Sequence, residues 1–140
     1  MAFALTKKKL AEMMAKLDFC MMSTVGPYGH LESRPMSNNR NVEWDGDTWF
    51  FTFADSDQAR QIEKNPNVNL AYQDTDSFLF IALSGKGSIS SSVAKKKELW
   101  YKDLERWFPE GPEDEKVVLI KVEGMHATVW SQDGDGELKL

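Results

Sequence analysis

The sequence contains little cysteine, no long apolar run and fewer basic than acidic residues. One cysteine, Cys20, occurs among 140 residues, so no disulfide can form within the chain. Nothing at the N-terminus resembles the apolar core of a signal peptide, and we therefore expect a reducing, cytoplasmic environment. No apolar run approaches the roughly 20 residues that a membrane-spanning helix needs, so no membrane association is expected.

Positive charge is in deficit. Lys and Arg number 17 against 22 Asp and Glu, which gives a formal net charge of -5. A nucleic-acid-binding domain is typically basic on one face, so we expect no nucleic-acid partner. Two runs of lysine, at residues 7–9 and 95–97, come at the starts of predicted helices and are interpreted as solvated helix faces.

Motifs of metal binding and catalysis are also missing. His30, His126 and Cys20 fall in three different predicted strands without HExxH or CxxC spacing, so no metal site is predicted. Residues 85–87 lack the third glycine of a dinucleotide fingerprint and the ending of a phosphate loop. Residues 133–137 are rich in Asp and Gly but too near the last residue for a calcium loop, and we interpret them as an acidic, frayed tail. No catalytic residue can be assigned.

What is present fits one globular domain over residues 1–140, with 41% hydrophobic and 28% charged residues. Apolar spacing and turn formers predict an α+β fold, an antiparallel sheet of about eight strands with flanking helices. Residues 26–29, Asp45-Gly46 and Gly124 are assigned to hairpin turns, and closure into a barrel would remove exposed edges. Pro66 is expected to end the second helix. The predicted helices are residues 5–17, 55–64 and 93–107, and the predicted strands are 19–25, 30–37, 42–44, 48–53, 68–73, 78–84, 85–91, 117–123 and 125–131.

The predicted strand that starts at His30 is the first of two stretches that suggest binding. Alternation places its even-numbered residues, Glu32, Arg34 and Met36 among them, on one face, while Pro35 interrupts the hydrogen-bond ladder. A carbonyl left unpaired beside such a proline is available to a ligand. The structural alternative is an edge-strand proline beside a surface arginine.

The second stretch is the start of the predicted helix at residues 55–64. A strand that runs into a helix N-terminus offers unpaired N–H groups and a partial positive charge to an anion. Asp55 is predicted to be the N-cap, and Gln58 is predicted to complete a capping box. This corner contains Asp55 and Asp57 but no lysine.

Several short segments, taken in order, carry a family resemblance. They are Ser23-Thr24, Ser33-Arg34-Pro35-Met36, Trp49-Phe50-Phe51-Thr52, Ser56 with residues 61–66, residues 68–72, Leu99-Trp100, Trp107-Phe108-Pro109 and Ala127-Thr128-Val129-Trp130. The ordered set covers nearly the whole chain and resembles the pyridoxamine 5′-phosphate oxidase-like, flavin-binding split barrels, within them the general stress protein branch. The resemblance implies a Greek-key split β-barrel with a six-stranded core, which forms a homodimer and binds flavin mononucleotide (FMN) at the subunit interface.

The resemblance also implies roles for a run of four residues in the second predicted strand. Arg34 would reach toward the ribityl-phosphate side of the flavin. The backbone of Pro35, Met36 and Ser37 would lie near the isoalloxazine ring. Arg34 carries this assignment best, because an arginine beside a strand proline suits an anion more than it suits the fold.

Five further positions match the family. Phe51 and Thr52 would touch the ring edge and the ribityl chain of the flavin. Ser56 and Gln58 occupy the positions of a phosphate-binding Ser-x-Lys motif, and Trp130 matches an aromatic residue that packs near the flavin from the other subunit. The alternative roles are barrel core for Phe51 and Trp130, strand formation for Thr52 and helix initiation for Ser56.

The sequence departs from the family pattern in two places. Gln58 stands where family members usually have lysine, and Asp57 where the true oxidases also have arginine. The loss of one charged partner, worth about 1.5–3 kcal/mol, would weaken phosphate binding without abolishing it. Residues 131–140 lack the Arg-x-His segment of the true oxidases, so oxidation of pyridoxine phosphate is not expected.

Two hypotheses follow. The first is an FMN-binding protein of the general stress branch, with FAD as a second candidate cofactor and with a flavin-dependent redox activity on an unknown substrate. The second is a split barrel that has lost FMN, and either serves as a non-catalytic stress or interaction module or binds another ligand such as FAD, a deazaflavin or haem. Asp57 and Gln58 favour the second.

Overall fold

A computed structural model describes residues 2–39 and 42–140 of the protein. Within these ranges the chain forms seven β-strands, three α-helices and one 3-10 helix, η1. Their bounds are α1 Lys7–Met14, β1 Phe19–Val25, β2 Leu31–Ser37, β3 Asp47–Phe53, α2 Asp57–Lys64, β4 Asn67–Asp74, β5 Leu79–Ser90, α3 Val93–Leu99, η1 Lys102–Arg106, β6 Val117–Ser131 and β7 Gly134–Lys139.

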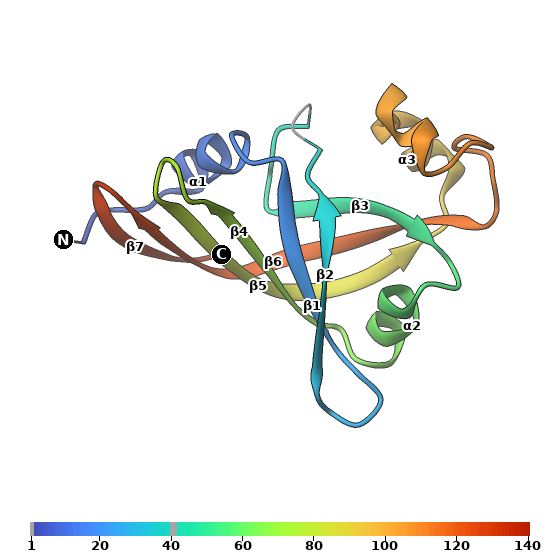
Figure 1. Ribbon diagram of the computed structural model, residues 1–140, viewed down its shortest axis with the longest axis horizontal. Helices are drawn as coiled ribbons and strands as arrows, with labels where there is room; N and C mark the ends of the chain where they lie inside the picture. The colour runs from blue at the N-terminus through green and yellow to red at the C-terminus, as the bar shows by residue number, and fades with distance from the viewer. Residues whose placement is uncertain (1, 40–41) are drawn as a thin grey trace.

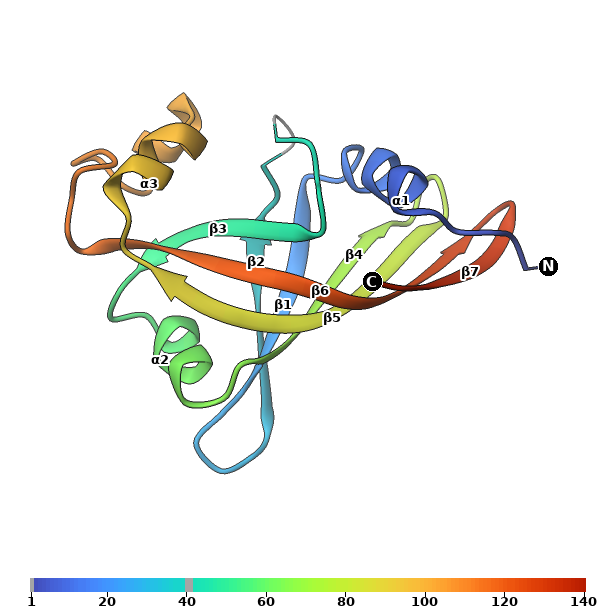
Figure 2. The same ribbon diagram turned by 180° about the vertical axis from the view of Figure 1, so that it is seen from behind.

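The strands form one curled antiparallel sheet. Six of them follow the order β2-β1-β4-β5-β6-β3, and β7 pairs with β6 outside this path. In Figures 1 and 2 strands β1 and β2 stand upright, while β3, β5 and β6 run across them. The two ends of the path, β2 and β3, are not paired with each other within the described ranges. The antiparallel α+β class predicted from the sequence is confirmed.

Alternation along the strands decides which side chains fill the space inside the curled sheet. Along β1, Cys20 and Met22 are buried, whereas Phe19 and Met21 point outward and are exposed. Burial raises the pKa of the Cys20 thiol to about 12, against the opposing effect of a hydrogen bond with Tyr72. The cysteine therefore belongs to the apolar core and stays protonated.

The predicted hairpin around Asp45-Gly46 is wrong. Residues 42–44 form no strand, and β3 pairs instead with the first half of β6. Trp44 is buried, and its indole Nε1 donates a hydrogen bond to the hydroxyl of Thr48 at 2.9 Å. The stretch before β3 is thus held by the tryptophan side chain, which a strand pairing across residues 45–46 would not allow.

The predicted hairpin around Gly124 is also wrong, because β6 is one continuous strand of 15 residues. Gly124 serves a close approach of the backbone: its N–H donates to the carbonyl of Gly46 at 2.8 Å. A Cβ at this position would lie 2.9 Å from the Leu140 side chain. The frayed tail predicted at residues 133–137 is wrong, because residues 134–139 form β7 and pair with the second half of β6.

Strand β5 is likewise one strand where two were predicted. Its pairing with β6 shifts between Ser84 and Gly85, so the predicted break corresponds to an irregularity within the strand. A Cβ on Gly85 would lie 2.3 Å from the carbonyl oxygen of Glu123 on β6. Only glycine fits at this crossing of the two longest strands.

All three α-helices are shorter than predicted, α2 by two residues at its start. α1 covers Lys7–Met14, with the hydroxyl of its N-cap Thr6 accepting the N–H of Lys9 at 3.1 Å. α3 ends at Leu99, because Trp100 takes an extended conformation with φ -66 and ψ 139, and η1 follows. The bend brings the Trp100 ring edge-on to Phe51, with 5.3 Å between the ring centroids.

The ammonium group of Lys96 attaches α3 to the start of β6. The residue is only 1% exposed, and its Nζ donates to the carbonyls of Asp114 at 3.0 Å and Val117 at 2.8 Å. The prediction of a solvated lysine run is therefore wrong for Lys96. Its neighbours Lys95 and Lys97 form surface ion pairs.

Gly85→Ala is expected to lower the free energy of unfolding, because the new Cβ would meet the backbone of Glu123. Overpacking of this kind typically costs about 1–3 kcal/mol. Denaturant unfolding measures the change, with Ser88→Ala, on the exposed side of the same strand, as a control expected within about 0.5 kcal/mol of wild type. An unfolding midpoint for Gly85→Ala equal to that of the control would contradict the close approach.

Candidate functional site

A groove of about 550 Å³ lies between β2, β3 and the segment that contains η1. Its volume falls in the range of small-molecule sites, roughly 300–1,000 Å³. Six of the nine residues that the family resemblance assigned to a cofactor line it, namely Pro35, Met36, Ser37, Phe51, Thr52 and Gln58. The structure thus brings together side chains from two strands and a helix that are separate in the sequence.

Strand β2 is at the edge of the sheet, so one of its sides is not covered by another described strand. Its residues Pro35, Met36 and Ser37 form one wall of the groove. Pro35 pairs with Met21 of β1 on its inner side, and no further strand within the described ranges needs its missing N–H. Met36 is buried, while Pro35 and Ser37 are exposed. The hydroxyls of Ser37 and Tyr101 lie 3.5 Å apart, so they link this wall to the opposite one.

Aromatic side chains form the opposite wall. The rings of Phe53 and Phe108 have centroids 4.9 Å apart, and Phe51 contacts both Trp100 and Phe108. Phe51 is half-buried, so it belongs both to this aromatic cluster and to the groove surface. The wall offers flat apolar surfaces suited to a planar ligand.

Thr52, Ser56 and Gln58 form a polar corner at the end of β3. The Ser56 hydroxyl accepts a hydrogen bond from Thr52 Oγ1 at 3.0 Å, and Gln58 Nε2 donates to Thr52 Oγ1 at 2.9 Å. Ser56 is the N-cap of α2, accepting the N–H of Ala59 at 3.3 Å. The predicted Asp55 cap and its capping box with Gln58 are therefore wrong, because Gln58 bonds to Thr52 instead.

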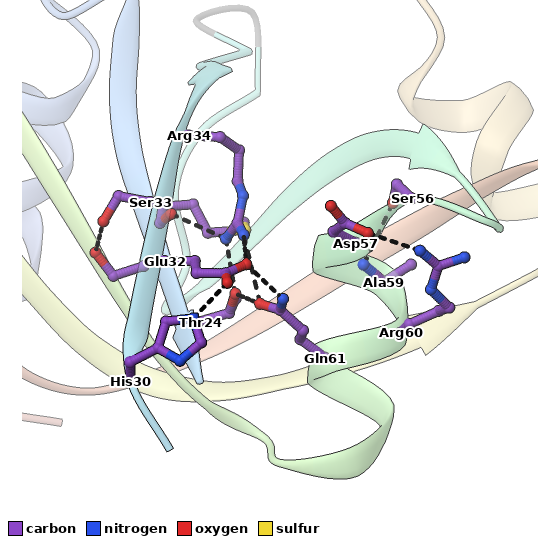
Figure 3. Close-up of polar contacts among 12 residues, drawn as sticks. Thr24, His30, Glu32, Ser33, Arg34, Ser56, Asp57, Ala59, Arg60 and Gln61 are labelled. Atoms are coloured by element: carbon purple, nitrogen blue, oxygen red, sulfur yellow. Dashed lines mark hydrogen bonds and ion pairs between the residues drawn. The ribbon is translucent and has the colours of Figure 1, made fainter. Parts of the chain in front are cut away.

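Arg34 does not line the groove; its guanidinium lies between β1 and α2. Figure 3 shows it pointing toward Thr24 and Gln61. Nη1 donates to the Thr24 hydroxyl at 2.7 Å and to the Met22 carbonyl at 3.2 Å, and Nη2 donates to Gln61 Oε1 at 3.4 Å. The side chain is 18% exposed, and this desolvation lowers the pKa of Arg34, while Glu32 and Asp57 oppose the shift.

Asp57, next to the polar corner, forms an ion pair with Arg60. Its carboxylate Oδ1 lies 2.6 Å from Nη2 of Arg60, one helical turn along α2, and the aspartate side chain is 70% exposed. The pair is drawn to the right of Arg34 in Figure 3. In the sequence, the negative charge of Asp57 seemed unfavourable for phosphate binding. In the structure this charge is paired with Arg60 and exposed to solvent.

Sequence reasoning missed the residues that contact Arg34. Gln61 Nε2 donates to Glu32 Oε1 at 2.7 Å, and Glu32 Oε2 lies 2.5 Å from His30 Nε2. Alternation had placed Glu32 on the face of Arg34, and that prediction is confirmed. The pairing of Thr24 with Glu32 across the hairpin was a second available signal, whereas Gln61 gave none.

The remaining predicted residue, Trp130, lies elsewhere. It sits near the end of β6, opposite Phe80 of β5, and is exposed. It does not line the groove of its own chain.

Among the residues that the structure describes, no cluster of His, Cys, Asp and Glu could hold a metal ion. No helix in the described ranges is long and apolar enough to cross a membrane.

Comparisons with known proteins agree with these features. The family described as pyridoxamine 5′-phosphate oxidase like matches residues 6–140 of the chain. General stress protein 26 of Bacillus subtilis (strain 168) is 31% identical over 96 residues, which make up 66% of this chain and 68% of that protein.

Solved structures share the fold. General stress protein 26 from Bacillus anthracis str. Sterne superposes with a TM-score of 0.75 at 27% identity, over 94% of this chain and 98% of that one. A pyridoxamine 5′-phosphate oxidase-related, FMN binding protein from Nostoc punctiforme PCC 73102 gives a TM-score of 0.74 at 16% identity, over 95% of this chain and 88% of that one. At that identity the second likeness shows the fold alone.

The carboxylate of Glu32 is expected to make stability depend on pH. Hydrogen bonds from Gln61 and then His30 lower its pKa in the folded state, so its contribution is present above the unfolded pKa and is lost as pH falls through the folded one. Thermal unfolding should therefore find Glu32→Gln less stable than wild type at about pH 7, with the difference shrinking as the pH falls and the Glu32 carboxylate becomes protonated. Glu63→Gln, on the exposed side of α2, is the control. A difference that persists unchanged in acid would contradict the assigned role of the charge.

Proposed function

Since the chain belongs to the pyridoxamine 5′-phosphate oxidase-like family, we propose that it binds FMN in the groove between β2, β3 and η1, as a homodimer. The single observation that carries this proposal is the gathering of six predicted cofactor residues along one groove of about 550 Å³. Those residues come from the family resemblance, and β2, β3 and α2 bring them to the same groove.

The chemistry of the groove supports a flavin. Its apolar and aromatic surfaces, from Met36 on one wall and Phe51 on the other, suit the isoalloxazine ring. The ribityl chain carries hydroxyls, and the polar corner of Thr52, Ser56 and Gln58 supplies donors and acceptors for them. When bound, the flavin would supply the hydride-transfer chemistry, and the protein would supply orientation.

The phosphate is proposed to lie between the polar corner and Arg34. Gln58 offers an amide N–H where relatives usually offer an ammonium, so one charge-assisted bond of about 1.5–3 kcal/mol is replaced by a weaker one. The charge of Asp57 is paired with Arg60 and solvated, which reduces its repulsion of a phosphate, although it still acts on Arg34. Arg34 and the first N–H groups of α2 remain as the anion-binding groups.

The outward face of the β1–β2 hairpin supports the dimer. Phe19, Met21 and Leu31 are exposed on it, and Met21, at 43% exposure, lies opposite Pro35 of the groove wall. Phe19 and Met21 alternate on one side of β1, and Leu31 lies further along the hairpin, opposite Val25. Exposed apolar residues on one face commonly mark a protein interface. A second copy that covers this face is proposed to bring its exposed Trp130 to the flavin.

The proposed activity is a flavin-dependent redox reaction, with substrate and electron donor left open. Oxidation of pyridoxine phosphate is not proposed, because residues 131–140 contain neither arginine nor histidine. The competing proposal is a split barrel that has lost FMN and serves as a stress or interaction module or holds FAD, a deazaflavin or haem. The uncharged Gln58 and the internal contacts of Arg34 favour it.

FMN is expected to bind saturably at micromolar protein, with quenching of flavin fluorescence as the measurement. Gln58→Lys should tighten binding about tenfold, because it restores a charged partner for the phosphate. Gln73→Lys, which makes the same charge change at an exposed position on β4, is the control and should leave affinity unchanged. Absence of saturable binding in both wild type and Gln58→Lys would exclude the flavin proposal in favour of its competitor.

The dimer is tested by placing a charge on the proposed interface. Met21→Asp should raise the dimer dissociation constant by about a hundredfold or more, because the carboxylate would be buried without a partner. Sedimentation velocity measures the change, and circular dichroism verifies the fold. Val93→Asp, at an exposed apolar position at the start of α3, is the control. A monomeric wild type, or a fully dimeric Met21→Asp, would overturn this interface.

A further inference from the structure

Gln61 occupies the junction between α2 and the β1–β2 hairpin, where it contacts three polar side chains. Its Oε1 accepts from the Thr24 hydroxyl at 2.5 Å and from Arg34 Nη2 at 3.4 Å. Its Nε2 donates to Glu32 Oε1 at 2.7 Å. Figure 3 shows the Gln61 amide beside the Glu32 carboxylate and the Thr24 hydroxyl, with the Arg34 guanidinium above them.

Only one orientation of the Gln61 amide satisfies both neighbours. A guanidinium can only donate hydrogen bonds, so the amide oxygen must face Arg34; an ionised carboxylate can only accept them, so the amide nitrogen must face Glu32. The Thr24 hydroxyl, which accepts from Arg34 and donates to Gln61, fits the same direction. Each group therefore donates to the next, from Arg34 to the Thr24 hydroxyl, then to Gln61, and from Gln61 to Glu32.

This arrangement leaves part of the Arg34 guanidinium available to a ligand. Nη1 directs its two hydrogens to Met22 and Thr24, which fixes the plane of the guanidinium. Nη2 lies beside Gln61, and Glu32 Oε1 is 4.0 Å away from it. The carboxylate is held at that distance while its Oε1 accepts from Gln61.

We propose that Gln61 is a positioning residue for phosphate binding: it aligns Arg34 and keeps the Glu32 carboxylate bonded to its own amide, away from the guanidinium. The inference rests on the proposed flavin function and adds to it a residue outside the groove. Glu32 and Arg34 already form a long ion pair at 4.0 Å. Without the Gln61 amide, the carboxylate would move onto Nη2 and shorten this pair to a hydrogen-bonded one. The guanidinium would then be more fully neutralised before a phosphate reached it.

The test compares FMN with riboflavin, which lacks the phosphate, by fluorescence titration. Gln61→Leu should lower the ratio of FMN affinity to riboflavin affinity about tenfold, the loss expected when one charged contact is removed. Riboflavin affinity itself should stay unchanged. Adding Glu32→Gln to Gln61→Leu should restore most of the ratio, because no carboxylate is left to pair with Arg34. A purely structural role for Gln61 would not produce that rescue.

Glu63→Leu, on the exposed side of α2, is the matched control and should not alter the ratio. If Gln61→Leu fails to fold, Gln61→Glu keeps the size of the side chain and should lower the ratio by placing a carboxylate against Arg34. An unchanged ratio in Gln61→Leu, or a parallel loss of both ligands, would overturn the inference.

The outcome for wild type separates this inference from the proposed function. Binding of both flavins without preference for FMN would overturn the inference and leave flavin binding intact. Binding of neither flavin would overturn both.

Discussion

Strand β6 is the element on which the rest of the molecule depends, because it pairs with β5, β3 and β7. Its pairing with β3 places Phe51 and Thr52 opposite Leu119 and Val118, which fixes one side of the groove. The Val117 carbonyl also accepts a hydrogen bond from Lys96, so α3, and η1 after it, are attached to the same strand. A slip in the register of β6 would therefore displace two walls of the groove together.

The elements that the sequence predicts best are those with local causes. The β1–β2 hairpin and α2 lie where they were predicted, because turn formers and Pro66 act over a few residues. The errors at Gly124 and Asp45-Gly46 have a different origin. A glycine needed because another backbone passes close by looks, in a sequence, like one needed for a turn. Lys96 is a similar case, since only the path of residues 114–117 explains its burial.

The residues of the candidate site also differ in whether local sequence or the tertiary fold determines their position. Family resemblance supplied the groove residues, strand alternation placed Glu32 beside Arg34, and hairpin register could have added Thr24. The role of Gln61 could not be predicted from the sequence. Its contacts are 29 residues away at Glu32 and 37 residues away at Thr24, and they depend on how α2 packs against the sheet. The helix cap was mispredicted for a related reason: Gln58 had a better partner in Thr52, on the preceding strand, than in the helix start.

The ion pair between Asp57 and Arg60 has a consequence for the speed of binding. The chain carries a formal charge of -5, and the charges of this pair offset each other at a distance, so neither residue would attract an anion from afar. Arg34, recessed between β1 and α2, would act mainly at contact. A ligand of the proposed phosphate site would then associate at an unsteered rate of about 10⁵–10⁶ M⁻¹s⁻¹, and its residence time would set the affinity. Its binding would also depend less on ionic strength than binding through exposed surface charge does.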